Sequence, residues 1–85
     1  MQDQDHRDKH FFFYFSTYRL EAPQDVMKVS GLKAIIAQHV PRFNPAYTLV
    51  QEECGDRPDK PLADNQEVRI HEIPHFYDQP PANFG

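Results

Sequence analysis

The segment His10–Phe15, with the sequence HFFFYF, decides the fold of this 85-residue chain. Aromatic residues favour strands, and such a run predicts one strand of a sheet. Successive side chains of a strand point to opposite faces, so the odd-numbered phenylalanines share one face, while Phe12 and Tyr14 share the other. Since Tyr14 carries a hydroxyl group, we expect the odd-numbered face to lie in the core.

A second strand is expected after a tight turn at Ser16–Thr17. Tyr18, Leu20 and Ala22 alternate with polar residues, which predicts a half-buried strand antiparallel to the first. The turn lacks an Asn-Gly or Asp-Gly pair, so the register of this hairpin stays open.

One helix should follow the loop 23–28. Ser30 is the expected N-cap, with Val29 before it as a staple residue. Lys33 lies off the apolar stripe, and Pro41 should end the helix at the preceding one or two residues. The stripe has helical spacing and consists of Leu32, Ile35, Ile36 and Val40.

The second half of the chain predicts two further strands and a short element. Tyr47–Glu52 alternates as a third strand, with Leu49 inward and Val50 outward. We expect 53–61 to form a polar loop with strong turn chemistry. The later elements are a turn at 63–65, a short extended element with Val68 and Ile70, a bend at 71–74, and a last strand that begins with Phe76 and Tyr77.

This order of elements predicts an α+β fold of the β-grasp type, in which a mixed sheet of four to five strands packs on one helix. In that fold the last strand runs beside the first, through the middle of the sheet. The expected organisation is a flexible leader at 1–9, one domain at 10–79, and an extended tail at 80–85.

The tail follows directly from the last strand and reads PPANFG. Pro80 and Pro81 favour an extended backbone, and Gly85 has no side chain. Such an arm fits a narrow channel and presents a bare carboxylate, as a protein whose C-terminus is the reactant requires. Whether Gly85 is the encoded end, a processed end or an arbitrary cut stays open.

Composition narrows the function. The net charge of −4 and pI near 5.6 argue against nucleic acid as a partner. No run is long and apolar enough for a membrane span. A single cysteine, Cys54, fits a cytoplasmic setting. Since a domain this small has little room for an enzyme's pocket, we expect neither catalytic residues nor a cofactor.

The potential metal ligands show no metal-site spacing. His71 and His75 are four residues apart across a proline-containing bend, and the acidic residues of the loops do not match a calcium loop. We therefore predict no metal site. Cys54 lies among acidic residues, and we expect an inert thiol.

Five stretches in this order resemble the bacterial multi-ubiquitin family of ubiquitin-like proteins, over roughly 10–85. They are HFFFYF, VSGLKAIIAQHVP, AYTLVQE, DNQEVRI and HFYDQPPANFG. The chain departs from the family at Asp78, where a small hydroxyl residue is usual, and at the first hairpin, which lacks Asp/Asn-Gly. The family often carries tandem copies, whereas this chain has one.

The resemblance implies that the chain is a ubiquitin-like modifier and not an enzyme. An activating enzyme would adenylate the Gly85 carboxylate with ATP and form a thioester. A conjugating enzyme would attach the chain to target proteins, and a deconjugating peptidase would remove it. Tail recognition would fall to Pro80, Pro81, Asn83 and Phe84; Phe84 departs from the Gly-Gly ending of ubiquitin. Operons of this kind suggest, by analogy, an antiviral role in bacteria.

Other surfaces have two readings each. Val50 and Tyr77 on neighbouring strands are either a partner patch of the kind ubiquitin-like domains use or incidental apolar residues. Exposed aromatics such as Phe12 and Tyr14 are a possible route to self-association. Four lysines could accept further copies of the modifier to form chains, or simply keep the surface soluble. They are Lys9, Lys28, Lys33 and Lys60.

Two other classes of function remain open at this point. The chain is alternatively a β-grasp interaction module with an inert tail, or a sulfur carrier with a C-terminal thiocarboxylate. No motif in the sequence identifies the target proteins. None indicates whether the acceptor is an amine or a hydroxyl group.

Overall fold

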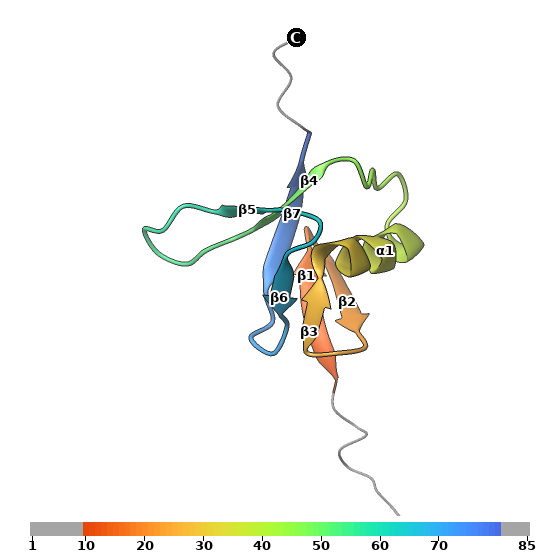
Figure 1. The fold of residues 1–85 in the computed structure, drawn as a ribbon, viewed down its shortest axis with the longest axis horizontal. Coiled ribbons are helices and arrows are strands. Elements are labelled where there is room, and N and C mark those ends of the chain that lie inside the picture. Colours follow the sequence, from red (N-terminus) through yellow and green to blue (C-terminus); the bar gives the residue numbers. More distant parts are fainter. Residues whose placement is uncertain (1–9, 81–85) are drawn as a thin grey trace, which may run out of the picture.

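The computed structural model describes residues 10–80, and its elements are drawn in Figure 1. One helix accompanies seven strands in this part of the chain. The elements are β1 (Phe11–Phe15), β2 (Tyr18–Ala22), β3 (Val26–Lys28), α1 (Val29–His39), β4 (Thr48–Gln51), β5 (Lys60–Leu62), β6 (Glu67–Arg69) and β7 (His75–Gln79). The leader predicted at 1–9 lies outside the described residues.

The main sheet has five strands in the order β2-β1-β7-β4-β5. β1 and β7 run parallel, while the other neighbours are antiparallel, so the sheet is mixed. β3 and β6 form a separate antiparallel pair. The structure confirms the α+β class, with one helix and a mixed five-stranded sheet. It also confirms that the last strand lies beside the first, in the middle of the sheet.

The core lies between the sheet and α1 (Figure 1). Phe13 and Phe15 are 0 % and 5 % exposed, and Phe11 packs against the core, which confirms the predicted inward face of β1. The ring of Phe13 meets that of Phe76 edge to face, with centroids 5.8 Å apart. This contact joins the two central strands, and such aromatic pairs add stability beyond the area they bury.

The hairpin between β1 and β2 has the predicted two-residue turn, and Phe15 pairs with Tyr18 across it. Ser16 adopts a positive φ of 54°, the backbone conformation such a turn demands. Leu20 and Ala22 are buried as expected. Tyr18 is 40 % exposed, contrary to the prediction, because it lies beside the turn on an outer strand.

The N-terminus of α1 differs from the prediction. The N-cap is Lys28, not Ser30, and no side chain caps the helix. Instead the N–H groups of Val29 and Ser30 donate to the carbonyl oxygens of Gln66 and Asp64, each at 2.9 Å. A turn distant in sequence thus satisfies two N–H groups that a helix leaves unpaired.

The helix ends where Pro41 predicted. Its last residue is His39, and the N–H of Val40 donates to Ile36 at 2.8 Å. Leu32, Ile36 and Val40 are buried and Ile35 is partly buried, as the stripe required.

Two segments expected to be loops contain strands. β3 lies within 23–28, and β5 begins at Lys60, inside the expected 53–61 loop. Each is three residues long and pairs with a strand distant in sequence: β3 with β6, and β5 with β4. Tertiary pairing overrides weak local preference here, which is why sequence alone missed both.

Candidate functional site

The end of β7 is the point from which the tail departs. β7 pairs with β1 on one side and with β4 on the other, and its last pair joins Gln79 to Thr48. Phe76 within it is 1 % exposed. β7 is paired on both sides at His75 and Phe76, whereas its last three residues pair with β4 alone up to Gln79, where Pro80 follows.

Pro80 is the first tail residue and the last described one; it is exposed and follows the strand directly. Its ring fixes φ and removes an N–H, so it cannot donate to a continued sheet ladder. The other residues predicted for tail recognition and conjugation lie outside the described residues: Pro81, Asn83, Phe84 and Gly85.

Tyr77 and Val50 are register partners on β7 and β4, so the prediction that they are neighbours is confirmed. Val50 also lies opposite Pro61 of β5, so β4 has β7 on one side of Val50 and β5 on the other. It is therefore only 2 % exposed, although it points away from the core that α1 covers. The expectation that Val50 faces out as an exposed apolar residue is wrong, and Tyr77, which is half-buried, offers the accessible surface.

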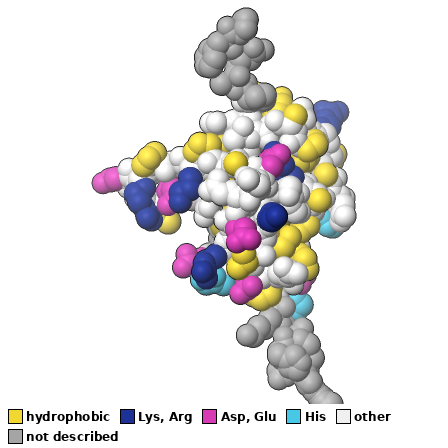
Figure 2. Space-filling view, viewed as in Figure 1, with side chains coloured by type: hydrophobic (Ala, Val, Ile, Leu, Met, Phe, Trp, Pro, Cys, Tyr) yellow, Lys and Arg dark blue, Asp and Glu magenta, His cyan; other side chains and the backbone are white. Residues whose placement is uncertain are grey.

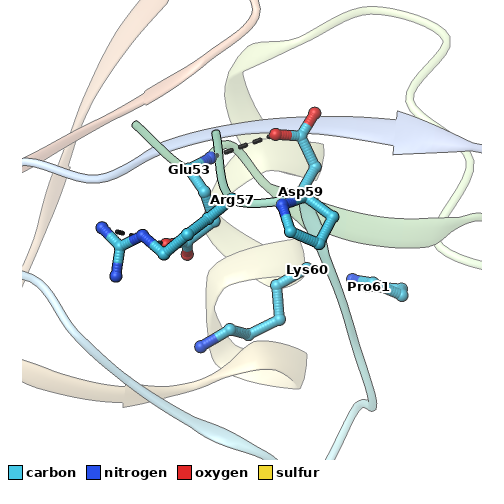
Figure 3. A pocket seen from close by; sticks show the side chains of 6 residues that line it. Glu53, Arg57, Asp59, Lys60 and Pro61 are labelled. Atoms are coloured by element: carbon cyan, nitrogen blue, oxygen red, sulfur yellow. Dashed lines mark hydrogen bonds and ion pairs between the residues drawn. The ribbon is translucent and has the colours of Figure 1, made fainter. Parts of the chain in front are cut away.

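The Tyr77 hydroxyl donates a hydrogen bond of 2.8 Å to Oδ2 of Asp59. The other oxygen of that carboxylate, Oδ1, accepts the backbone N–H of Glu53 at 3.1 Å (Figure 3). These two bonds close the loop between β4 and β5 and fasten it to the central strand. Sequence reasoning missed this contact because Asp59 lies in the expected polar loop, eighteen residues before Tyr77.

These hydrogen bonds shift the pKa values of Asp59 and Tyr77 in opposite directions. The Glu53 N–H, followed by the Tyr77 hydroxyl, lowers the pKa of Asp59 below its usual 3.8. The bond to Asp59 is the main cause that raises the pKa of Tyr77 above its usual 10.0. The pair therefore consists of a carboxylate and a neutral phenol, which is a structural arrangement: the phenol is a weaker nucleophile than a free tyrosine.

An open pocket lies beside this contact, lined by Glu53, Arg57 and Asp59 together with Pro58, Lys60 and Pro61 (Figure 3). Charges of both signs gather on the loop, which projects at the left of Figure 2. Arg57 lies 3.6 Å from Glu53, and Asp59 is occupied by its two donors. The carboxylates of Glu53 and Asp59 are thus engaged with other groups of the protein.

Further aromatic rings lie on the sheet face that α1 does not cover. Tyr14 of β1 stacks on His75 of β7, with ring centroids 4.7 Å apart. The guanidinium of Arg19 lies 4.0 Å above the ring of Phe12. Phe12 and Tyr14 are both half-buried, so neighbouring side chains cover part of each ring.

The predicted acceptor lysines differ in accessibility. Lys28 and Lys60 are exposed, whereas Lys33 is 6 % exposed. The Nζ of Lys33 donates to the carbonyl oxygen of Pro45 and to Oδ1 of Asp64, both at 2.8 Å. The expectation that Lys33 is a solvated residue is wrong, because Pro45 and Asp64 hold its ammonium against the domain. Lys9 lies outside the described residues.

Cysteine, histidine and acidic side chains are the remaining candidates for a site. Cys54 is exposed in the loop after β4. Across residues 10–80, no three His, Cys, Asp or Glu side chains lie close enough together to hold a metal ion. α1 is too short and too polar to cross a membrane, and it is the one helix of this range.

Comparisons with protein-family models, with curated proteins and with solved structures find no match to this chain. Any assignment therefore depends on the residues and the geometry described above.

Proposed function

We propose that this chain has a ubiquitin-like β-grasp fold and acts as a protein modifier. Its reactive group is the carboxylate of Gly85, whether encoded as the end or exposed by processing. The observation that carries the proposal is the position of β7. This central strand lies between β1 and β4, pairs with β4 as far as Gln79, and is followed directly in the sequence by Pro80 and Pro81.

The chemistry follows from the nature of the acyl donor. A carboxylate is a poor acyl donor because its leaving group is poor, so an activating enzyme first joins the Gly85 carboxylate to the α-phosphorus of ATP, and pyrophosphate leaves. A cysteine thiolate of that enzyme displaces adenylate and forms a thioester. A conjugating enzyme then passes the acyl group to a nucleophile on a target protein, with an isopeptide bond as the product when the acceptor is a lysine amine. A deconjugating peptidase hydrolyses that bond.

The tail supports this assignment by its composition. Proline residues such as Pro80 and Pro81 favour an extended backbone, and an extended arm enters a narrow enzyme channel at low entropic cost. Phe84 provides an apolar anchor for that channel, and Asn83 provides hydrogen-bonding groups. Gly85 leaves space around the carbonyl carbon for the tetrahedral intermediates of both transfers.

The domain body has a supporting role. In this proposal the partner enzymes supply the catalytic groups. The half-buried Tyr77 with His75 and Tyr14 offers a recognition surface on the open sheet face. We place the protein in the bacterial cytoplasm, in a conjugation pathway with a defensive role against viruses, on the resemblance alone.

Incubation with the cognate activating enzyme and ATP tests the proposal. Intact-mass measurement should show a thioester adduct with the enzyme that deletion of Gly85 abolishes. A sulfur carrier would instead gain the mass of sulfur in place of oxygen, and an interaction module with an inert tail would show no change. Either of these last two results would contradict the proposal.

A further inference from the structure

The two outer edges of the five-stranded sheet differ in how they resist strand addition. β5 is three residues long and contains Lys60 and Pro61, the residue types with which natural sheets block their edges. β2 is five residues long, pairs with β1 in continuous register, and contains neither lysine nor proline. The edge formed by β2 is therefore the one that is available for pairing with a further strand.

The backbone of β1 shows which groups of β2 point outward. The N–H groups of Tyr14 and Ser16 donate to the β7 side, to Pro74 at 3.0 Å and to Phe76 at 2.9 Å. The odd-numbered residues of β1 consequently direct their N–H and C=O groups towards β2. Their partners are Tyr18, Leu20 and Ala22.

Residues of an antiparallel pair alternate between hydrogen-bonded and non-hydrogen-bonded positions. Since the even-numbered residues of β2 bond to β1, Arg19 and Glu21 direct their N–H and C=O groups away from the sheet. Their side chains are exposed and share the face that α1 does not cover.

Contacts with Phe12 of β1 and with His10 before it hold these two opposite charges over the neighbouring strand, on the sheet face next to the edge. The Arg19 guanidinium lies over Phe12, and Oε2 of Glu21 lies 2.6 Å from Nδ1 of His10. An open pocket lined by Arg19, Leu20, Glu21, Phe12 and His39 adjoins the strand. The edge thus offers free main-chain groups, one positive charge and one negative charge in a fixed order.

We propose that β2 pairs with β2 of a second copy of this chain, antiparallel about a two-fold axis at Leu20. In this register Arg19 lies opposite Glu21 of the second copy, and Glu21 lies opposite Arg19 of the second copy. Each of these two residue pairs exchanges both of its N–H···O bonds and sets opposite charges side by side. The same surface serves both copies, as a two-fold interface requires.

The charges select this register over its neighbours. A shift by two residues in either direction sets Arg19 opposite Arg19, or Glu21 opposite Glu21, and like charges placed opposite each other destabilise a strand pair. Pro23 occupies the next outward-facing position and has no N–H to donate, so it ends the ladder.

Charge reversal in the full chain tests the pairing. Sedimentation equilibrium of the unaltered chain should show a concentration-dependent dimer. Arg19→Glu and Glu21→Arg should each weaken self-association by about tenfold or more, since each variant sets like charges opposite each other twice. An equimolar mixture of the two variants should associate again, because every facing pair is then Glu with Arg. The doubly reversed chain, R19E with E21R, should dimerise alone.

Circular dichroism and thermal unfolding of each variant check that the monomer stays folded. The backbone is tested by Arg19→Pro, which removes an outward N–H that β1 does not use, and it should also abolish the dimer. A chain that stays monomeric at every concentration would overturn the proposal. So would two variants that dimerise like the unaltered chain, or a mixture that does not recover association. None of these changes touches the tail, so the result is independent of the function proposed for Gly85.

Discussion

Tyr77 in the central strand β7 donates a 2.8 Å hydrogen bond to Asp59, eighteen residues earlier in the chain. Because Asp59 also accepts the N–H of Glu53, one carboxylate joins both ends of the β4–β5 loop to the middle of the sheet. The loop is therefore an attached part of the domain, although it projects from its side (Figure 1).

Replacing Tyr77 by Phe should change how stability depends on pH. The lowered pKa of Asp59 means that its contribution is present above 3.8, the usual value, and is lost as the pH falls through the folded-state pKa. Loss of the hydroxyl should raise the pKa of Asp59 but leave it below 3.8, because the Glu53 N–H, the larger cause, remains. An NMR titration of the Asp59 carboxyl measures this shift.

The alkaline side gives a second readout of the same variant. The raised pKa of Tyr77 means that its contribution is present below 10.0 and is lost as the pH rises through the folded-state pKa. This loss should disappear in Tyr77→Phe and persist in Tyr18→Phe, the control on the outer strand. If the stability of Tyr77→Phe still fell at alkaline pH as it does in the unaltered chain, the phenol would not hold the loop in solution.

Lys33 and Asp64 should respond unequally to substitution. Asp64→Ala removes the carboxylate that pairs with the buried ammonium of Lys33. We expect a loss of about 1–2 kcal/mol in the free energy of unfolding, a modest value because the Asp64 carboxylate is itself largely exposed to water. Lys33→Met keeps the apolar stem and removes the charge, so we expect a change below about 1 kcal/mol. Urea unfolding of both single variants and the double variant measures the difference. Equal losses from the two single changes would refute this view of the pair.

The burial of Lys33 also predicts which lysines accept further copies. Linkage mapping by mass spectrometry of self-conjugates should find isopeptide bonds at the exposed Lys28 or Lys60 and none at Lys33. Arg replacements at Lys28 and Lys60 should reduce such conjugates, while Lys33→Arg should leave them unchanged. A linkage at Lys33 would contradict this prediction, because its Nζ would first have to leave Pro45 and Asp64.

Two glycines should react in opposite ways to alanine. Gly31 lies in α1, where a Cβ would meet only the flexible end of Met27 at 3.2 Å, so Gly31→Ala should stabilise by roughly 0.5 kcal/mol through helix propensity. Gly55 has a φ of +69° and open space around it. Gly55→Ala should therefore cost about 1 kcal/mol for backbone reasons alone. Thermal unfolding compares the pair, and a stabilising Gly55→Ala would contradict the backbone argument.

The predictions from sequence succeeded where one strong local signal decided the outcome. The alternation of HFFFYF fixed the inward face of β1, and Pro41 fixed the end of α1. The central position of β7 also followed, because the order of elements predicted a type of fold in which the last strand runs beside the first.

The predictions failed where a partner distant in sequence decides the outcome. Lys33 is buried because Pro45 and Asp64 supply acceptors, and Val50 is buried because Tyr77 and Pro61 flank it. β3 and β5 are strands only because β6 and β4 pair with them. Local propensity contains none of this information.

The most direct test of the central claim is the identity of the bond formed with the activating enzyme. After reaction with ATP, digestion and tandem mass spectrometry should find the carbonyl carbon of Gly85 joined to the sulfur of an enzyme cysteine, in a bond that hydroxylamine cleaves. The same experiment on the chain lacking Gly85 is the control and should give no such peptide. Absence of the Gly85–cysteine peptide from the unaltered chain, with active cognate enzyme and ATP present, would contradict the assignment as a modifier.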